Sequence, residues 1–299
     1  MNPSLISAEE AIKLTGGKGS VGNIVFADGS FHLPTTGRDA NAEYRDCRIN
    51  GAIRFDIELI ADRQAALPHT MPGPDQFAAM MQGLGINNDD LVIIYDRSVF
   101  LSAARPWWML RYFGHCRVAI LNGGLNAWQQ AGGQTQSGTS DMPRKTGDFS
   151  IRPRCSGDGL ASLDRMQELI ATPPEQRQQQ VLDARSASRF DGSAAEPRPG
   201  MASGHMPGAL NLPVTDLLDA VTGQVLPLEA LRQAVASSGL DLEKPVVTTC
   251  GSGVTACGLA FGLHLLGKDD IAVYDGSWSE WGSPDQDRDR CPVATGSGE

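Results

Sequence analysis

The feature that most constrains the fold is an internal repeat, in which four short motifs occur twice in the same order at roughly half the chain length. The motif pairs are 23–28 with 180–184, 49–55 with 206–212, 91–96 with 246–250, and 121–128 with 274–281. Four matches in one order indicate two copies of one domain. We therefore predict a first domain over residues 1–135, a linker over 136–158 and a second domain over 159–299.

Within each copy, short apolar strands alternate with helical stretches, which favours a mainly parallel sheet flanked by helices. Ser7 and Glu10 have the spacing of a capping box, and Ser162 precedes apolar residues at helical intervals. Residues 76–83 and 228–237 are further predicted helices. The predicted fold class is α/β, with two tandem domains of one topology.

Composition excludes several classes of partner. The net charge of −10 argues against nucleic acid and anionic membranes as main partners. No apolar run approaches the length of about 18 residues expected of a membrane span, and residues 1–10 lack the pattern of a signal peptide. The six cysteines have no C-x-x-C pair, zinc spacing or pattern of a disulfide framework. We therefore expect a reducing compartment and a cytoplasmic location.

The strongest chemical signal is Cys250, which follows an apolar strand pattern at 245–249 and precedes a predicted helix at 257–266. This arrangement places a thiol at the carboxyl edge of a parallel sheet, where α/β proteins bind ligands. A flexible glycine loop and a helix start both favour an anion, and hence the thiolate nucleophile. The alternative is an inert, buried cysteine in a tight turn. The small and polar residues of 251–255 favour the reactive thiol.

The first copy has Asp96 where the second has Cys250. A carboxylate cannot act as a thiol nucleophile. We therefore predict that only the second copy carries out covalent sulfur chemistry, and that the first domain is non-catalytic.

Together these motifs resemble the two-domain rhodanese-like sulfurtransferases over nearly the full chain. The residues that carry the resemblance are 250–256 (Cys-Gly-Ser-Gly-Val-Thr-Ala), 204–209, 107–108, 113–115, 121–124 and 95–96. The resemblance implies two tandem rhodanese-like domains and is strongest to the branch that uses 3-mercaptopyruvate. Cys250 would take the sulfur, release pyruvate and become a persulfide. A thiol, thioredoxin or cyanide would then accept the sulfur in a ping-pong reaction.

The resemblance also implies how the charged sulfur is held. Backbone N–H groups of 251–256, including those of Gly251, Gly253, Val254 and Thr255, would act as preorganised donors. The resemblance implies no metal and no organic cofactor.

The residues that bind the donor are implied by position. Arg189 and Arg198 occupy the positions of the family's substrate arginines, and a guanidinium fork suits a planar carboxylate. Thiosulfate-using relatives carry basic residues directly after the cysteine, where this chain has Gly251 and Ser252. Either arginine could instead form a surface ion pair. For Arg185 we expect either a surface ion pair or a structural pair with Asp183.

In the family, a serine at the place of Ser252 is linked to a histidine and an acid from the first domain. His69 matches the histidine, and Glu58 stands where an aspartate is usual. This set would bond the leaving group or relay a proton. His69 could alternatively be a surface loop residue. We expect Cys257, about two helical turns beyond Cys250, to belong to a helix core rather than to act as a resolving thiol.

Three alternative functions remain open. A thiosulfate sulfurtransferase differs only in its donor. A non-catalytic sulfur carrier would accept sulfur without turnover. A cysteine phosphatase needs an arginine six residues after its cysteine, where this chain has Ala256.

Overall fold

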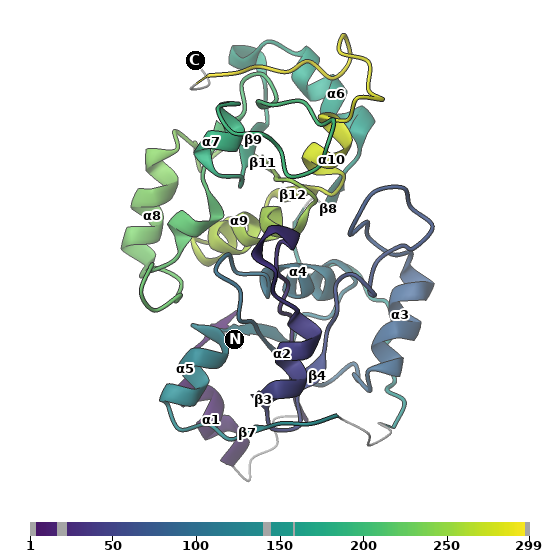
Figure 1. Ribbon diagram of the computed structural model, residues 1–299, viewed down its shortest axis with the longest axis vertical. Coiled ribbons are helices and arrows are strands. Elements are labelled where there is room, and N and C mark those ends of the chain that lie inside the picture. The colour runs from purple at the N-terminus through teal and green to yellow at the C-terminus, as the bar shows by residue number, and fades with distance from the viewer. Residues whose placement is uncertain (1–3, 17–22, 140–144, 158, 297–299) are drawn as a thin grey trace. The chain divides into compact units, whose positions relative to one another are not determined.

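The computed structural model describes residues 4–16, 23–139, 145–157 and 159–296 (Figure 1). The described residues within Met1–Arg63, Met71–Cys155 and Asp219–Val225 form an N-terminal unit. Those within Gln64–Thr70, Ser156–Leu218 and Leu226–Glu299 form a C-terminal unit. Each unit therefore includes one short segment from the other half of the sequence. The predicted domain boundaries stay predictions.

The N-terminal unit contains a five-stranded parallel sheet in the order β1-β6-β5-β2-β4. Its strands are β1 (Leu5–Ile6), β2 (Ile24–Asp28), β4 (Ile53–Arg54), β5 (Leu91–Tyr95) and β6 (Val118–Leu121). Its helices are α1 (Ala8–Gly16), α2 (Ala40–Asp46), α3 (Pro74–Gly83), α4 (Ala104–Tyr112) and α5 (Gly124–Gln130), with a 3-10 turn η1 (Pro34–Thr36). An antiparallel pair, β3 (Arg48–Ile49) and β7 (Thr135–Gln136), lies apart from this sheet.

The C-terminal unit repeats the same strand order, as β8-β12-β11-β9-β10, and all pairs are again parallel. Its strands are β8 (Gly159–Ala161), β9 (Gln180–Asp183), β10 (Leu210–Asn211), β11 (Val246–Thr249) and β12 (Ile271–Tyr274). Its helices are α6 (Leu163–Ala171), α7 (Ala187–Phe190), α8 (Leu228–Ser237), α9 (Val254–Leu265) and α10 (Ser277–Trp281), with 3-10 turns η2 (Pro174–Gln176) and η3 (Val214–Leu217). The predicted α/β fold with two equivalent parallel sheets is confirmed.

The helix starts predicted from capping patterns are also confirmed. The Glu10 N–H donates to the Ser7 hydroxyl at 3.2 Å, and the Ser7 N–H donates to the Glu10 carboxylate at 3.0 Å. The Ser162 hydroxyl accepts the Arg165 N–H at 3.2 Å. These bonds satisfy backbone donors that the first turn of a helix leaves without a partner.

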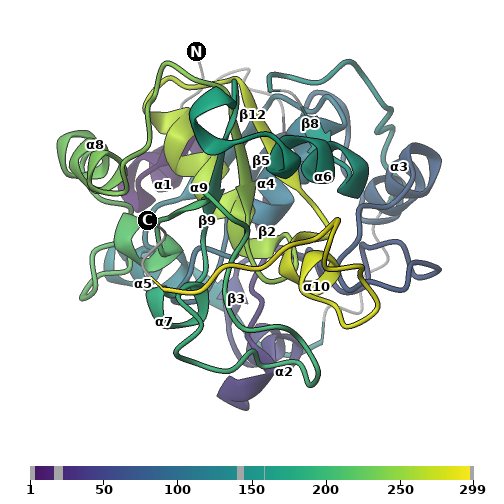
Figure 2. The ribbon, with the colours of Figure 1, turned by 90° about the horizontal axis from the view of Figure 1, so that it is seen from above.

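Both faces of the C-terminal sheet are covered, as a parallel sheet requires. Figure 2 shows α6 and α10 on one side of its strands and α8 and α9 on the other. Val247 of β11 packs on the first side with Met166, Trp278 and Trp281, all buried. Helix α9 packs against β11, β12 and η3. Covering both faces leaves the carboxyl edge of the sheet as the place for polar chemistry.

The segment predicted as a linker runs along the N-terminal unit from residue 145 to residue 155. The Gly147 N–H donates to the Gln82 carbonyl at 2.9 Å, and Phe149 is fully buried beside Phe77. Among the described helices, none is long and apolar enough to cross a membrane.

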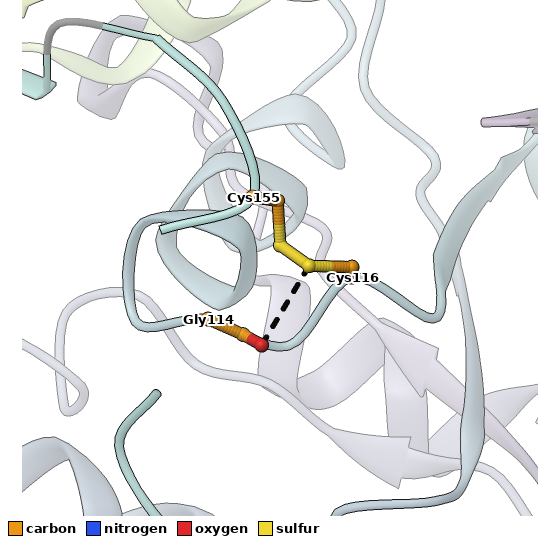
Figure 3. The surroundings of a disulfide bond; sticks show 3 residues. All are labelled: Gly114, Cys116 and Cys155. Atoms are coloured by element: carbon orange, nitrogen blue, oxygen red, sulfur yellow. Dashed lines mark hydrogen bonds between the residues drawn. A yellow bond between two sulfur atoms is a disulfide. The ribbon is translucent and has the colours of Figure 1, made fainter. Parts of the chain in front are cut away.

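One expectation about the cysteines is wrong. Cys116, before β6, and Cys155, at the end of the linker, form a disulfide with a Cα–Cα distance of 5.5 Å (Figure 3). The pairing joins positions 39 residues apart, so no local cysteine pattern announces it. The expectation of a reducing compartment loses the support it drew from the cysteines. The cytoplasmic location stays a prediction.

Candidate active site

Cys250 lies directly after β11, a strand with neighbours on both sides, and is buried at 2 % exposure. A three-residue turn follows, and α9 begins at Val254. Gly253 ends this turn with a φ of 79°, in the left-handed region that favours glycine. The thiol is thus held at the carboxyl edge of the sheet and at the start of a long helix, as predicted from the sequence.

A buried serine that the sequence analysis did not assign holds the loop from behind. The Ser277 hydroxyl accepts the N–H groups of Cys250 and Gly253, both at 3.1 Å. It donates to the Tyr274 carbonyl at 2.7 Å and lies 4.0 Å from the Cys250 sulfur. Ser277 has a φ of 49°, which is strained for a serine. One hydroxyl therefore fixes both ends of the turn.

The start of α10 fixes the other side of the same turn. The Trp278 N–H donates to the Cys250 carbonyl at 2.9 Å, and the Ser279 N–H donates to the Gly251 carbonyl at 2.8 Å. With both carbonyls engaged, the loop has little freedom to rotate. The conformation of the loop around Cys250 is therefore fixed by hydrogen bonds within the protein.

The predicted set of N–H donors needs one correction. The Gly253 N–H already bonds the Ser277 hydroxyl, so it is engaged away from the sulfur. The N–H groups of Val254, Thr255 and Ala256 are the first of α9, and no carbonyl of their own helix accepts them. They lie at the positive end of the helix dipole, which favours an anion. The role of these residues and of Gly251 at the sulfur stays a prediction.

Ser252 and His69 lie together in the C-terminal unit. His69 Nδ1 is 3.0 Å from the Ser252 hydroxyl, although the two residues are 183 positions apart. Depending on the tautomer, His69 Nδ1 either carries a hydrogen and donates it to the hydroxyl, or is unprotonated and accepts the hydroxyl hydrogen. His69 has a φ of 59°, a strained value of the kind that clusters at functional sites. The geometry suits a proton relay, and the relay itself stays a prediction.

Glu58 belongs to the N-terminal unit, and its side chain is exposed. Its N–H donates to the Asp56 carboxylate at 3.0 Å. Among the described residues, none forms an ion pair with the Glu58 carboxylate. Its place in the relay stays a prediction.

Arg189 lies beside the active loop. A methyl group added to Gly251 would lie 3.2 Å from Arg189 Nη2 and 3.9 Å from Nη1. The other edge of the guanidinium is bound by Glu196, through Nε at 3.1 Å and Nη2 at 2.5 Å. The Nη1–Nη2 edge of the Arg189 guanidinium therefore faces the thiol loop. The role of Arg189 in binding a donor carboxylate stays a prediction.

The short helix α7 that carries Arg189 is itself well anchored. The Phe190 ring stacks on His205 with ring centroids 3.8 Å apart, and His205 Nδ1 donates to the Phe190 carbonyl at 2.8 Å. Burial lowers the pKa of His205, which favours the neutral ring. These contacts fix the position of α7, the helix that carries Arg189.

The other two predicted arginines differ in their surroundings. Arg198 is exposed and forms no ion pair with any described residue, so its role in binding a carboxylate stays a prediction. Arg185 is buried and forms an ion pair with Asp183 at 2.7 Å, which confirms the predicted structural pair. Arg185 also bonds Glu196 at 2.8 Å. Because Glu196 also pairs with Arg189, it connects Arg189 to the buried Arg185.

Cys257 lies in the buried core of α9, as predicted. Its thiol donates to the Gly253 carbonyl at 3.3 Å. Within the described residues, no group of three or more His, Cys, Asp or Glu side chains is placed to hold a metal ion.

Two residues of the site, Ser277 and Glu196, were missed from the sequence. Ser277 lies in the repeated motif 274–281, where the first copy has Gly124. The exchange of glycine for serine within a repeat was the available signal. Glu196 stands two residues before Arg198, but its contact with Arg189 across seven positions has no local pattern.

Comparisons with known proteins agree with this geometry. Residues 38–131 and 162–284 match the model of the rhodanese-like domain. The chain is 40 % identical to the 3-mercaptopyruvate sulfurtransferase of Homo sapiens, over 85 % of this chain and 83 % of that protein. It is 38 % identical to the mitochondrial thiosulfate/3-mercaptopyruvate sulfurtransferase 1 of Arabidopsis thaliana, over 85 % of this chain and 70 % of that protein.

A solved structure extends the similarity to the fold. The crystal structure of SseA from Escherichia coli, presented as a 3-mercaptopyruvate sulfotransferase, superposes with a TM-score of 0.79 at 32 % identity. The match covers 93 % of this chain and all of that one.

Proposed function

Because this chain belongs to the rhodanese-like family, we propose that it is a sulfurtransferase that moves sulfur from 3-mercaptopyruvate through a persulfide on Cys250. The observation that carries the proposal is the active loop itself. The Cys250 thiol lies at a helix start, its loop is held by Ser277, and the Arg189 guanidinium lies against Gly251. A nucleophilic sulfur and a carboxylate-binding cation thus share one small region.

In the first half of the reaction, the Cys250 thiolate attacks the donor sulfur and a sulfur–sulfur bond forms. The carbon–sulfur bond of the donor breaks, and its electron pair stays on carbon as the enolate of pyruvate. The proton that leaves the donor thiol balances the proton that the enolate takes up. The 3.0 Å contact between Ser252 and His69 supports a role for this pair in carrying such a proton.

In the second half, a nucleophilic acceptor attacks the outer sulfur of the persulfide. The sulfur–sulfur bond breaks, and its electrons return to Cys250 as the thiolate. Small thiols, thioredoxin and cyanide all have the nucleophile that this step requires. The first N–H groups of α9 would stabilise the negative sulfur in both halves.

Thiosulfate is the second candidate donor. Two plant relatives, each 38 % identical to this chain, carry both donors in their names. Against thiosulfate, the loop residues Gly251 and Ser252 offer no charged side chain to a dianion. We therefore place thiosulfate below 3-mercaptopyruvate.

The test is intact-protein mass spectrometry before and after addition of 3-mercaptopyruvate without acceptor, with pyruvate measured in parallel. We expect one added sulfur atom per chain and one pyruvate released. Cys250→Ser should gain no mass, whereas the matched control Cys257→Ser, in the same helix region, should gain sulfur like the wild type. Comparable kcat/KM for thiosulfate and 3-mercaptopyruvate would overturn the choice of donor.

A further inference from the structure

Glu196 is a buried carboxylate between two arginines, beside the active loop. Its side chain is only 5 % exposed. Oε1 accepts from Arg185 Nη1 at 2.8 Å and from Arg189 Nε at 3.1 Å. Oε2 accepts from Arg189 Nη2 at 2.5 Å. One carboxylate thus bridges the core and the guanidinium that faces the loop.

The core side of this bridge is rigid. Arg185 has a fully buried side chain and donates through Nη2 to Asp183 at 2.7 Å and to the Gly204 carbonyl at 2.8 Å. Its guanidinium lies over the Trp278 ring at 4.2 Å, a cation–π contact. Burial is the largest single influence on Arg185 and lowers its pKa, but the charges and hydrogen bonds of Asp183 and Glu196 together outweigh burial and raise that pKa. Arg185 therefore stays charged and fixes the position of Glu196.

The contact between Glu196 and Arg189 determines which N–H groups of Arg189 remain available to bind a ligand. Glu196 takes the Nε–Nη2 edge of Arg189, so the N–H groups of Nη1 and the second N–H of Nη2 remain for a ligand. Those two nitrogens are the atoms nearest to the space above Gly251. A two-point match with one planar carboxylate is the arrangement that this free edge permits.

Charge balance points in the same direction. Asp183, Arg185, Glu196 and Arg189 contribute two negative and two positive charges, so this cluster has no net charge. A donor with a single carboxylate still gains the two directed bonds from Arg189. A compact dianion such as thiosulfate depends more on net positive charge, which Glu196 removes.

We propose that Glu196 is a positioning residue that orients Arg189 towards the active loop and sets the preference for a monocarboxylate sulfur donor over a dianionic one. The inference rests on the proposed function, since it concerns the donor of that same site. It requires both the shape and the charge of the side chain. Two variants separate these properties, because Gln keeps the shape without charge and Asp keeps the charge with a shorter reach.

The experiment is steady-state kinetics of Glu196→Gln and Glu196→Asp with 3-mercaptopyruvate and with thiosulfate, using cyanide as acceptor. For Glu196→Gln we expect KM for 3-mercaptopyruvate to rise about tenfold, the loss of one charge-assisted bond, with kcat within about threefold. The ratio of kcat/KM for thiosulfate to that for 3-mercaptopyruvate should rise at least about tenfold. Glu196→Asp should raise KM and leave this donor ratio near the wild-type value.

The matched control is Glu229→Gln, an exposed carboxylate on α8, which should change neither parameter. Wild-type KM and donor ratio in Glu196→Gln would overturn the inference. If that variant does not fold, a wild-type KM in Glu196→Asp would overturn it alone. A wild-type protein that is inactive with 3-mercaptopyruvate would instead overturn the proposed function, so the two failures are distinguishable.

Discussion

The two copies place different side chains at the same point of one scaffold. Asp96 follows β5 and Cys250 follows β11, and each carbonyl accepts an N–H from the helix after the next strand. The Leu125 N–H donates to Asp96 at 3.2 Å, and the Trp278 N–H donates to Cys250 at 2.9 Å. The backbone is thus held alike in both units, so the chemistry differs through the side chains.

In the N-terminal unit the loop binds its own carboxylate. Asp96 Oδ2 accepts the hydroxyl of Ser98 at 2.6 Å, the hydroxyl of Ser102 at 3.0 Å and the N–H of Ala103 at 3.0 Å. These donors are therefore consumed internally. In the C-terminal unit the Cys250 side chain is smaller, and the first N–H groups of α9 have no acceptor within their own helix. We infer that the N-terminal loop cannot bind an external anion, because the Asp96 carboxylate already occupies its hydrogen-bond donors.

The position behind each loop differs in the same way. Gly124 and Ser277 are equivalent in the repeat and both have positive φ, at 57° and 49°. A methyl group on Gly124 would lie 2.1 Å from the Asp96 carbonyl oxygen, so only glycine fits there. The serine in the active copy carries a backbone strain of about 1–3 kcal/mol. Its hydroxyl offsets that strain by bonding both ends of the thiol loop.

The largest expected effect comes from exchanging the residues that differ at the equivalent position of the two loops, Cys250 and Asp96. Cys250→Ser should abolish sulfur transfer, because a hydroxyl neither ionises near neutral pH nor carries a persulfide. Asp96→Cys should not create a second site, because the N-terminal loop lacks the Ser277 hydroxyl. Cyanide-dependent thiocyanate formation measures both, with Cys257→Ser as control. Sulfur loading on residue 96 would contradict the argument.

A second large effect concerns the turn between helix and strand that follows each loop. In the N-terminal unit Cys116 is cross-linked to Cys155, whereas in the C-terminal unit His264 pairs with the exposed Asp269 at 2.8 Å. Reduction of the disulfide should lower the free energy of unfolding by about 2–4 kcal/mol. Asp269→Asn should cost at most about 1 kcal/mol. Denaturant unfolding with and without a dithiol measures the difference.

Cys155→Ser is the control for that experiment, and its stability should not respond to the dithiol. An equal response in wild type and Cys155→Ser would mean that the reductant acts elsewhere.

The third prediction concerns the arginines. Arg189→Ala should raise KM for 3-mercaptopyruvate strongly, by about 1.5–3 kcal/mol for a lost charge-assisted bond. Arg198→Ala should raise KM as well, because Arg198 is the second arginine predicted to bind the donor carboxylate. Initial rates across donor concentrations measure both, with the exposed Arg232→Ala on α8 as control. Wild-type KM in both variants would exclude a carboxylate clamp.

The fourth prediction tests the glycine–serine exchange. Ser277→Ala and Ser277→Gly should each lower kcat/KM by about tenfold to a hundredfold, since two hydrogen bonds to the loop are lost. Ser277→Gly should melt at a higher temperature than Ser277→Ala, because glycine relieves the positive φ. Ser279→Ala removes a neighbouring hydroxyl that donates to the Gly276 carbonyl, and should retain activity. Full activity of Ser277→Gly would show that the hydroxyl is dispensable.

The smallest effect is a pH dependence of stability. Burial raises the pKa of Asp96, with the hydrogen bonds from Ser98, Ala103 and Ser102 opposing it. A raised folded pKa contributes stability that is full below the unfolded value of about 3.9 and is lost as pH rises through the folded value. Asp96→Asn has no such loss. Its melting temperature relative to wild type should therefore increase from acid to neutral pH, and a flat difference would contradict this account.

Much of the architecture could be predicted because its signals are local or repeated. The capping pairs at Ser7 and Ser162 act within one helical turn, and the apolar strands alternate with helices at regular intervals. The repeated motifs predicted that both domains share one topology, and the two sheets have the same strand order. The pattern of strand, cysteine, glycines and helix placed Cys250 at the sheet edge. The family resemblance predicted His69 and Arg189 as site residues. In the structure His69 contacts Ser252, and Arg189 lies beside Gly251.

The sequence by itself determined the duplicated α/β fold and the position of the thiol, because these depend on periodicity and on neighbours along the chain. Only the tertiary structure decided that Ser277 holds the loop, that Glu196 bridges two arginines, and that Cys116 pairs with Cys155. Each of these contacts joins residues without a local pattern, and hydrogen bonds and ion pairs depend on distance in space. The packing of strands and helices sets those distances, so these contacts form only in the folded protein.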